Sequence, residues 1–420
     1  MGRSDLQANN SRNLHKSRQT CITITGMKHT LLAAIVLRLL ATLAGPFPVS
    51  AEITQTALPE TRIEPAYAGE DICLPGAYLL PQDDCLAVGP SQTLTEYAKK
   101  GLTLPLRPLP ATSPDPELTK HPLNFAKVDL PPPEQAQLYS SLESALRGSN
   151  PVGALPASPM LFVSYVRRSD VDGKKYVQTP GGHWLRASPA SYSLFQGLLF
   201  QRNPPNSFGW IVDTAEVRSA PGYRAAKLKF TIPRNTPVQI FDKVNQDGVD
   251  WYLININQWV ERRYIRQVTV NPIPPKGVEN QRWIEVNLYE QTLMVYENGN
   301  LVFATLVASG LKPFYTQPGL FKIYKKKSTE RMMGSFEADR SDFYYLEDVP
   351  WTMYYDQARA LHGAYWRAMF GYPQSHGCVN LSMGDSHWLY NWAKEGDWVY
   401  VWDPSGQTPT DPKFYTPGGA

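Results

Sequence analysis

The residues best suited to chemistry lie in the stretch LHGAYWRAMFGYPQSHGCVNLS, residues 361–382. It holds two His-Gly pairs, and the second pair, His376-Gly377, runs directly into Cys378. A protonated thiol is a poor nucleophile, but a neighbouring imidazole can accept its proton and leave a reactive thiolate. Two imidazoles are available, because His376 lies two residues before the cysteine and His362 lies sixteen residues before it.

The residues around the cysteine supply the other requirements of acyl transfer. Gly377 lets a substrate carbonyl approach the backbone closely, and it lets successive N–H groups converge as an oxyanion hole requires. Gly363, Gly371 and Pro373 lie between His362 and Cys378, so this segment can fold back and place the imidazole opposite the thiol. The stretch therefore offers a nucleophile, a base and backbone donors.

Cys378 has two other possible roles, an inert core thiol and a zinc ligand. A lone cysteine is most often an inert core thiol, but two histidines and two glycines make an unusual environment for one. A zinc site built from His362, His376, Cys378 and His387 has spacings that match no zinc ligand pattern. We expect no metal and no cofactor, and we expect His387 to be a surface or packing residue of a helix.

Composition limits the classes of protein. The 420-residue chain has a net charge of only +3 and no basic stripe with interleaved aromatic residues, which argues against nucleic-acid binding. It is long enough for two or three domains. High proline and glycine content, 37 and 29 residues, together with 12% aromatic residues, favours short strands and many turns.

The N-terminus has the pattern of an export leader. Lys28 and His29 precede an apolar run over residues 31–44, and Val49 and Ala51 occupy the small-residue positions of a cleavage site. Residues 1–51 are predicted to be a leader and secretion signal, cleaved near Ala51. Met27 is an alternative start, and an uncleaved anchor is an alternative fate. Either way the protein is predicted to act outside the cytoplasm, secreted or associated with the envelope, with membrane contact only through the leader.

Export changes how the four cysteines are interpreted. Removal of the leader removes Cys21, and Cys73 and Cys85 are then predicted to form a disulfide in an oxidising compartment. This leaves Cys378 unpaired. The surrounding region, residues 52–155, is proline-rich and weakly patterned, and no function is assigned to it.

An internal repeat precedes the cysteine region. The segments at 172–184 and 247–259 both begin with Asp-Gly, a hairpin signal, and both end in Trp. They predict two small β-barrel modules, at residues 156–200 and 207–270. AEVRSAPG, residues 215–222, resembles the start of bacterial SH3-like domains. Such modules would bind the cell wall or serve only as spacers.

A third unit is predicted at residues 281–403. It begins with alternating strand patterns and an Asn298-Gly299 turn, the strongest short cue for a hairpin. It ends with a helix capped by Ser382 and a closing strand at 397–402. Residues 404–420 are predicted to be a C-terminal tail.

The cysteine region resembles the signature of the YkuD-type L,D-transpeptidases. The matching positions are His362, Ser375, Gly377, Cys378 and Asn380, with twelve residues between the histidine and the serine. Upstream, Q-x-L-x-V-Y-x-x-G and T-x-P-G-x-F-x-I are similar to the same family. The resemblance covers residues 281–403 and implies a mainly β protein: a YkuD-like β-sandwich with one or two helices, preceded by the two SH3-like modules.

The resemblance implies a mechanism as well as a fold. Cys378 would attack the L-to-D peptide bond of a peptidoglycan tetrapeptide stem, with His362 as general base and the Gly363 carbonyl orienting its imidazole. N–H groups of Gly377 and Cys378 would stabilise the tetrahedral intermediate. D-Ala would leave, and the amine of a diamino acid in another stem would resolve the thioester into a 3→3 cross-link.

The remaining site residues are assigned to substrate and loop. Ser375 and His376 would shape the loop, and Asn380 would hold the loop or the substrate. Either Tyr354 or Tyr355 would line the pocket. The partners implied are peptidoglycan stem peptides, and the wall through the SH3-like modules, for a monomeric protein.

The sequence is also compatible with other functions. The same thioester could be resolved by water, as in an L,D-carboxypeptidase, or by a wall protein. A sortase-like enzyme fits less well, because no Arg follows Cys378. A non-catalytic wall-binding protein, in which the modules do the binding, is the alternative from another class.

Overall fold

The computed structural model describes residues 90–415, except 129, 131–133, 336 and 338. The predicted leader, its alternative start at Met27 and the Cys73–Cys85 disulfide lie outside the described residues. Within them, no helix has both the length and the apolar character needed to cross a bilayer.

Strands dominate the described residues, which confirms the prediction of a mainly β protein. Only three α-helices occur among them: α1 (Pro90–Lys99), α2 (Leu142–Arg147) and α3 (Met383–Trp392). Short 3-10 turns occur at η2 (Pro116–Thr119), η3 (Arg262–Tyr264) and η4 (Pro412–Phe414).

The first sheet has seven strands in the order β1-β10-β21-β20-β19-β27-β22. The Asn298-Gly299 turn joins β20 to β21, and both residues have positive φ, 52° and 76°, as a two-residue hairpin of matching twist requires. This predicted hairpin is confirmed. The strands are β1 (Ala111–Thr112), β10 (Leu198–Phe200), β19 (Arg282–Asn287), β20 (Thr292–Glu297), β21 (Asn300–Leu306), β22 (Gly319–Lys322) and β27 (Trp398–Trp402).

The second sheet carries the cysteine region. Its order is β26-β25-β24-β5-β2-β9, and β23 also pairs with β24. Its strands are β2 (Asn124–Lys127), β5 (Met160–Tyr165), β9 (Ser188–Pro189), β23 (Lys325–Gly334), β24 (Tyr344–Asp356), β25 (Arg359–Gly363) and β26 (Val379–Leu381).

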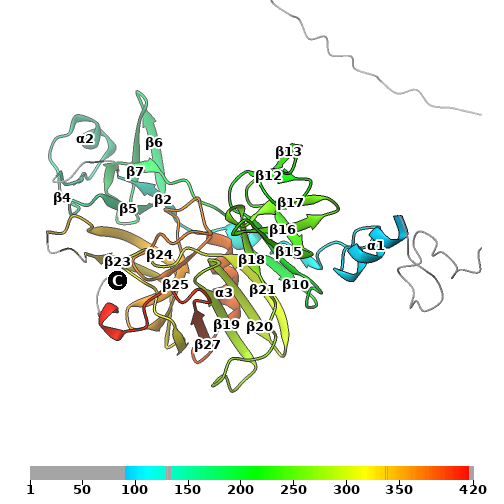
Figure 1. Ribbon diagram of the computed structural model, residues 1–420. Coiled ribbons are helices and arrows are strands. Elements are labelled where there is room, and N and C mark those ends of the chain that lie inside the picture. Colours follow the sequence, from blue (N-terminus) through cyan, green and yellow to red (C-terminus); the bar gives the residue numbers. More distant parts are fainter. Residues whose placement is uncertain (1–89, 129, 131–133, 336, 338, 416–420) are drawn as a thin grey trace, which may run out of the picture. The chain divides into compact units, whose positions relative to one another are not determined.

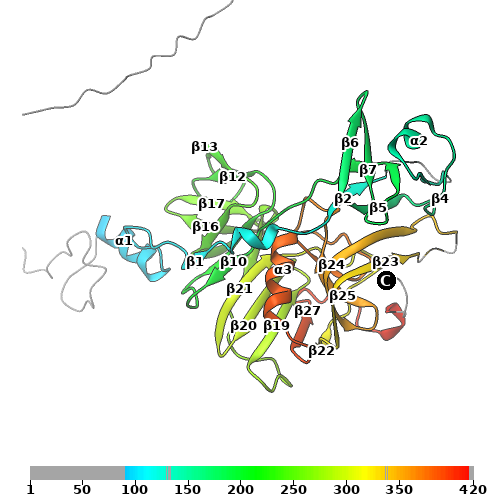
Figure 2. The same cartoon turned by 180° about the vertical axis from the view of Figure 1, so that it is seen from behind.

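The two sheets share one apolar core. Ile284 and Val286 from β19 meet Met353, Leu361 and Val379 from the second sheet, and all five are fully buried. Helix α3 runs between the strands of the two sheets (Figure 1, Figure 2). A strand face that is buried in this way explains the alternation seen in the sequence of β19.

Asp385 anchors helix α3 to the sheets. Its carboxylate accepts hydrogen bonds from the N–H groups of Gln196 and Gly197 and from the hydroxyls of Thr305 and Ser382. Ser382 is the N-cap, as predicted. One buried carboxylate therefore holds the start of the helix, and with it the end of β26, against the first sheet.

The structure does not confirm an SH3-like module at residues 156–200. Strand β5 pairs in parallel with β24 and antiparallel with β2, and β10 pairs with β21, so this segment contributes to both main sheets. The physical reason is burial: Leu161, Phe162 and Val163 are consecutive and all buried, which suits a strand inside a larger sheet.

The predicted hairpin within that segment is nevertheless present. Strands β6 (Arg167–Val171) and β7 (Lys174–Gln178) are joined by Asp172-Gly173, whose φ values are 51° and 72°. Strand β8 (Trp184–Arg186) adds a third strand. The two remaining short strands, β3 (Gln137–Leu138) and β4 (Gly153–Ala154), pair with each other.

Residues 207–268 form two small sheets around a core that contains Ile211, Val217, Tyr252 and Val260. We call this part module 2, and its SH3-like character stays a prediction. Its strands are β11 (Ser207–Ile211), β12 (Ala215–Arg218), β13 (Lys227–Ile232), β14 (Pro237–Ile240), β15 (Asp242–Gln246), β16 (Val249–Asn255), β17 (Gln258–Glu261) and β18 (Ile265–Val268). Asp247-Gly248 joins β15 to β16, as its sequence predicts.

Candidate active site

Two neighbouring strands bring the candidate nucleophile and base together. Strands β25 and β26 are parallel, and their register sets His362 beside Asn380. Cys378, a free thiol, directly precedes β26. His362, Asn380 and Cys378 line a single cavity of about 40 Å³, together with Ser375 and His376. Residues up to eighteen apart in the sequence thus meet at one end of the second sheet.

The loop before the cysteine is held in a tight bend. Gly377 has φ of 116°, and a Cβ there would lie 3.3 Å from Arg359 Nε and 3.4 Å from Tyr315 O. Thr316 Oγ1 donates to the Gly377 carbonyl at 2.8 Å. Both the conformation and the close approach of neighbours require glycine at this position.

Ser375 bridges two backbone groups of this loop. Its Oγ accepts from the Gly377 N–H at 3.1 Å and donates to the Cys378 carbonyl. The Gly377 N–H is therefore engaged with Ser375 in this structure. It can serve as an oxyanion donor only after leaving that partner.

Hydrogen bonds define the protonation of His362 without ambiguity. Arg367 Nε can only donate, and it lies 2.6 Å from Asn380, so the atom facing it must be the amide oxygen. Asn380 therefore turns its NH₂ group toward His362 Nε2, at 3.0 Å. Nε2 must accept, and Nδ1 carries the proton that is donated to the Gly363 carbonyl at 3.0 Å. The imidazole is neutral and keeps its lone pair on Nε2.

Electrostatics agree with this assignment. Burial, together with the charge of Arg367, lowers the pKa of His362 to about 4, although the bond to Gly363 opposes the shift. Burial also raises the pKa of the Cys378 thiol, against the opposing effects of the Ala360 N–H and Arg359. The resting pair is a neutral thiol and a neutral imidazole, not the thiolate–imidazolium pair that the sequence suggested.

Arg367 is a site residue that sequence reasoning missed. Besides Asn380, it donates to the side chain of Gln374 at 3.1 Å and to the Gln374 carbonyl. Burial lowers the pKa of Arg367 to about 10, and no described carboxylate pairs with it. Burying a cation without a counter-ion lowers the stability of the fold, because the charge loses its hydration. Its position beside the cavity therefore indicates a role in the site.

The tyrosines expected in the pocket are arranged differently from the prediction. Tyr344, rather than Tyr354 or Tyr355, lines the cavity, where its ring stacks on His376 with centroids 5.5 Å apart. The fully buried Tyr355 lies close enough for a Cys378 thiolate to raise the pKa of its hydroxyl, which has no hydrogen-bond partner in the described structure. The same negative charge also contributes to raising the pKa of Tyr354.

Apolar residues form the rest of the cavity wall. Met332 and Leu346 come from β23 and β24, and Met160 comes from β5, in the segment that was predicted to be the first SH3-like module. No motif marks Met160 as a site residue, because it reaches the cavity only through the pairing of β5 with β24.

Met160→Ala should weaken substrate binding more than it slows chemistry. Loss of the apolar wall is expected to raise KM for the donor peptide about three- to tenfold with little change in kcat, measured by steady-state kinetics. Met333→Ala is the control, because Met333 follows Met332 on β23 but is 46% exposed and lies outside the cavity. An unchanged KM for Met160→Ala would contradict this role.

His387 is not part of the site. Its ring stacks on Trp351 at 4.3 Å between centroids, and its Nδ1 bonds the Leu118 carbonyl at 2.9 Å. It therefore packs helix α3 against η2. Among the residues that the structure describes, no three His, Cys, Asp or Glu side chains are grouped to hold a metal ion.

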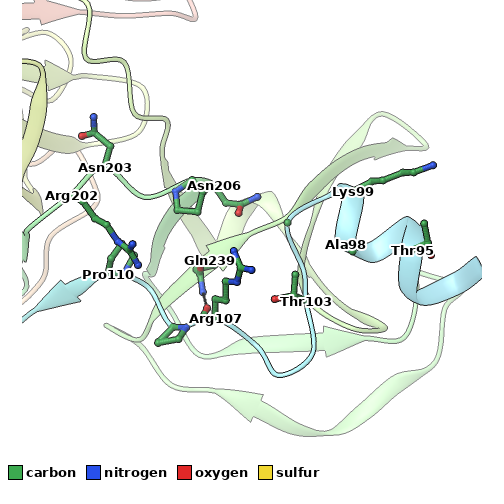
Figure 3. A pocket seen from close by; sticks show the side chains of 13 residues that line it. Thr95, Ala98, Lys99, Thr103, Arg107, Pro110, Arg202, Asn203, Asn206 and Gln239 are labelled. Carbon is green, nitrogen blue, oxygen red and sulfur yellow. Dashed lines mark hydrogen bonds between the residues drawn. The ribbon is translucent and has the colours of Figure 1, made fainter. Parts of the chain in front are cut away.

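A larger cavity, of about 710 Å³, lies elsewhere, beside helix α1 and module 2 (Figure 3). Its basic residues are Lys99, Arg107 and Arg202, and Gln239 Nε2 donates to the Arg107 carbonyl at 2.7 Å. Its lining contains no thiol, imidazole or carboxylate, so it lacks the groups for acyl transfer.

The family comparison agrees with the geometry of the cysteine region. The model of the family described as "YkuD: L,D-transpeptidase catalytic domain" matches residues 281–401. The predicted YkuD domain is confirmed for these residues. L,D-transpeptidase domains act on peptidoglycan stem peptides. A search among curated proteins gave no match.

Solved structures similar to the chain include several L,D-transpeptidases. One from Stackebrandtia nassauensis is 30% identical over 31% of this chain and 58% of its own length, with a TM-score of 0.24. The catalytic domain of the Enterococcus faecium enzyme is 25% identical over 30% of this chain and 100% of its own, with a TM-score of 0.27. L,D-transpeptidase 1 of Mycobacterium tuberculosis is 21% identical over 34% of this chain and 76% of its own length, with a TM-score of 0.25.

Proposed function

We propose that the protein is an exported L,D-transpeptidase that forms 3→3 cross-links in peptidoglycan. The observation that carries the proposal is the free Cys378 thiol in one cavity with a neutral His362. Its unprotonated Nε2 can take the thiol proton once Asn380, which donates to it in this structure, is displaced. Export, and action at the cell wall, belong to the proposal and rest on the leader pattern of residues 28–51.

The first half of the reaction forms a thioester. The Cys378 proton passes to His362 Nε2, and the sulfur attacks the carbonyl of the third stem residue, at the L-to-D peptide bond. The tetrahedral intermediate collapses, the C–N bond breaks, and His362 returns its proton to the nitrogen of the departing D-Ala. Imidazolium at this buried site is unfavourable next to Arg367, which favours prompt release of that proton to the amine.

The second half regenerates the enzyme. The side-chain amine of a diamino acid in another stem attacks the thioester and gives up a proton to His362. The C–S bond breaks, the new amide forms, and Cys378 recovers its proton. Water in place of the amine would give a tripeptide, and an amine of a wall protein would give attachment, by the same chemistry.

Three groups near Cys378 are candidate donors to the developing oxyanion. The Cys378 and Gly377 N–H groups are the backbone candidates, the latter once released by Ser375. The Tyr355 hydroxyl is a buried donor without a described partner, close enough to Cys378 to respond to its charge. We assign Tyr355 rather than Tyr354 to this role.

Acylation by a carbapenem tests the proposal directly, because the strained ring carbonyl reacts as the scissile amide would. Intact mass spectrometry should show one adduct on the wild type and none on Cys378→Ala. Incubation with disaccharide-tetrapeptide should then give cross-linked dimer. Tripeptide without dimer would favour the carboxypeptidase alternative, and a wild type that is inert in both assays would favour the non-catalytic wall-binding alternative.

A further inference from the structure

A third cavity, of about 570 Å³, lies between module 2 and the first sheet, on the sheet face opposite the shared core. We call it the side cleft. Ligand sites often lie in such clefts between units of structure, and none of its lining residues belongs to the Cys378 cavity. Its walls include Glu285 and Asn287 of β19, Trp402 of β27, Gln267 of β18, and the polar residues Thr269 and Asn271 that follow.

Glu285 is the unusual residue of the side cleft. Its neighbours Ile284 and Val286 face the apolar core, whereas Glu285 faces the cleft and is only 6% exposed. Trp402 Nε1 donates to it at 2.8 Å, but no cation pairs with it among the described residues. Burial raises the pKa of Glu285 to about 7. A carboxyl kept in such a place, at a cavity, is typical of a ligand-binding group.

The chemistry of the side cleft suits a sugar. Its lining combines carboxyl, amide and hydroxyl groups with two aromatic rings, and it contains no lysine or arginine. Sugar hydroxyls both donate and accept, as these groups require. Tyr289 is 45% exposed, and the guanidinium of Arg262 lies 4.7 Å over its ring, so the C–H face of a pyranose can stack on the other face of that ring. The larger cavity in Figure 3 has the opposite character, basic and without carboxylates.

The side cleft continues toward the catalytic loop. A neighbouring cavity of about 350 Å³ shares Tyr289, Ser405 and Gln407 with it and reaches Thr316 and Pro373. Thr316 Oγ1 bonds the Gly377 carbonyl, and the neighbouring Leu311 N–H bonds the Ser375 carbonyl at 2.9 Å. A chain lying through both cavities would therefore end against the loop that carries Cys378.

We propose that the side cleft binds a neutral, N-acetylated oligosaccharide, the glycan chain of the polymer whose stem peptide reacts at Cys378. Naming that polymer rests on the proposed function, whereas the sugar recognition itself does not. The cleft would hold the glycan while the stem reaches the thiol.

Calorimetric titration of the full-length Cys378→Ala protein with the β-1,4-linked tetramer of N-acetylglucosamine tests the inference. Saturable binding is expected. Tyr289→Ala, at an exposed position that should not affect folding, and Glu285→Gln, which keeps the side-chain shape, should each weaken it about tenfold, as the loss of one stacking or hydrogen-bonding contact predicts. Arg107→Ala, in the separate basic cavity, should bind like the parent.

Absence of saturable binding, or a Tyr289→Ala protein that binds like its parent, would overturn the side-cleft assignment. Unchanged binding in Arg107→Ala supports it, and weakened binding there would place the sugar in the basic cavity instead. The wild type's acylation by carbapenem is measured separately. Sugar binding without acylation would contradict the proposed transpeptidase function and support the side-cleft assignment. Acylation without sugar binding would support the transpeptidase function and contradict the side-cleft assignment.

Discussion

His362→Gln should lower the rate of Cys378 acylation about a thousandfold, within the range that loss of a general base produces. The glutamine amide can still reach the Gly363 carbonyl or Asn380, so the packing of β25 against β26 is largely kept. What disappears is the unprotonated Nε2 that the hydrogen bonds of Gly363 and Asn380 assign to His362. Single-turnover acylation followed by mass spectrometry measures the loss.

The pH profile distinguishes loss of the base from a general disturbance. The reaction needs neutral His362, whose pKa is lowered to about 4, so wild-type acylation should hold as pH falls from 7 to 5 and decline near pH 4. His362→Gln should lack this acid limb. His387→Gln, at a histidine outside the cavity, is the control and should acylate at the wild-type rate. An acid limb near pH 6.5 would contradict the neutral buried imidazole.

The sequence predicted local features of the fold well and distant pairings poorly. The turns at Asp172-Gly173, Asp247-Gly248 and Asn298-Gly299 were identified because a two-residue hairpin depends on the backbone preferences of its own two residues. The pairing of β5 with β24 joins segments about 180 residues apart, and no local pattern encodes it. Residues 156–200 were therefore predicted to be a separate module.

The residues of the candidate site also differ in whether a local sequence pattern identifies them. Cys378, His362, Ser375, His376 and Asn380 lie in one motif, and their spacing indicated acyl transfer before any geometry was known. The cavity wall depends on pairing between distant strands, so Met160 could not be recognised from its neighbours. An arginine in a surface loop and a buried arginine such as Arg367 look alike in sequence.

Arg367→Met should slow acylation about a hundredfold, because breaking a buried charged contact leaves its partners unsatisfied. Methionine keeps the length and apolar stem of the side chain but cannot donate to Asn380. The amide is then free to rotate and present its oxygen to Nε2, which would favour the tautomer with the proton on Nε2 and remove the acceptor. Loss of the charge should also raise the pKa of His362, so the acid limb should move from about pH 4 toward higher pH.

The acylation rate of Arg367→Lys should lie between those of the wild type and Arg367→Met. We expect about a tenfold loss, because lysine keeps the charge but not the planar set of donors. Arg331→Met, at an exposed arginine of β23 outside the cavity, should leave the rate unchanged.

A double-mutant cycle separates positioning from a structural role. If Arg367 acts through Asn380, then Asn380→Ala combined with Arg367→Met should cost little more than either change alone. Nitrogen-15 NMR of His362 should show a single Nδ1–H tautomer in the wild type and a mixture in Arg367→Met. Additive losses, with the tautomer unchanged, would mean that the guanidinium acts on the substrate directly and not through the imidazole.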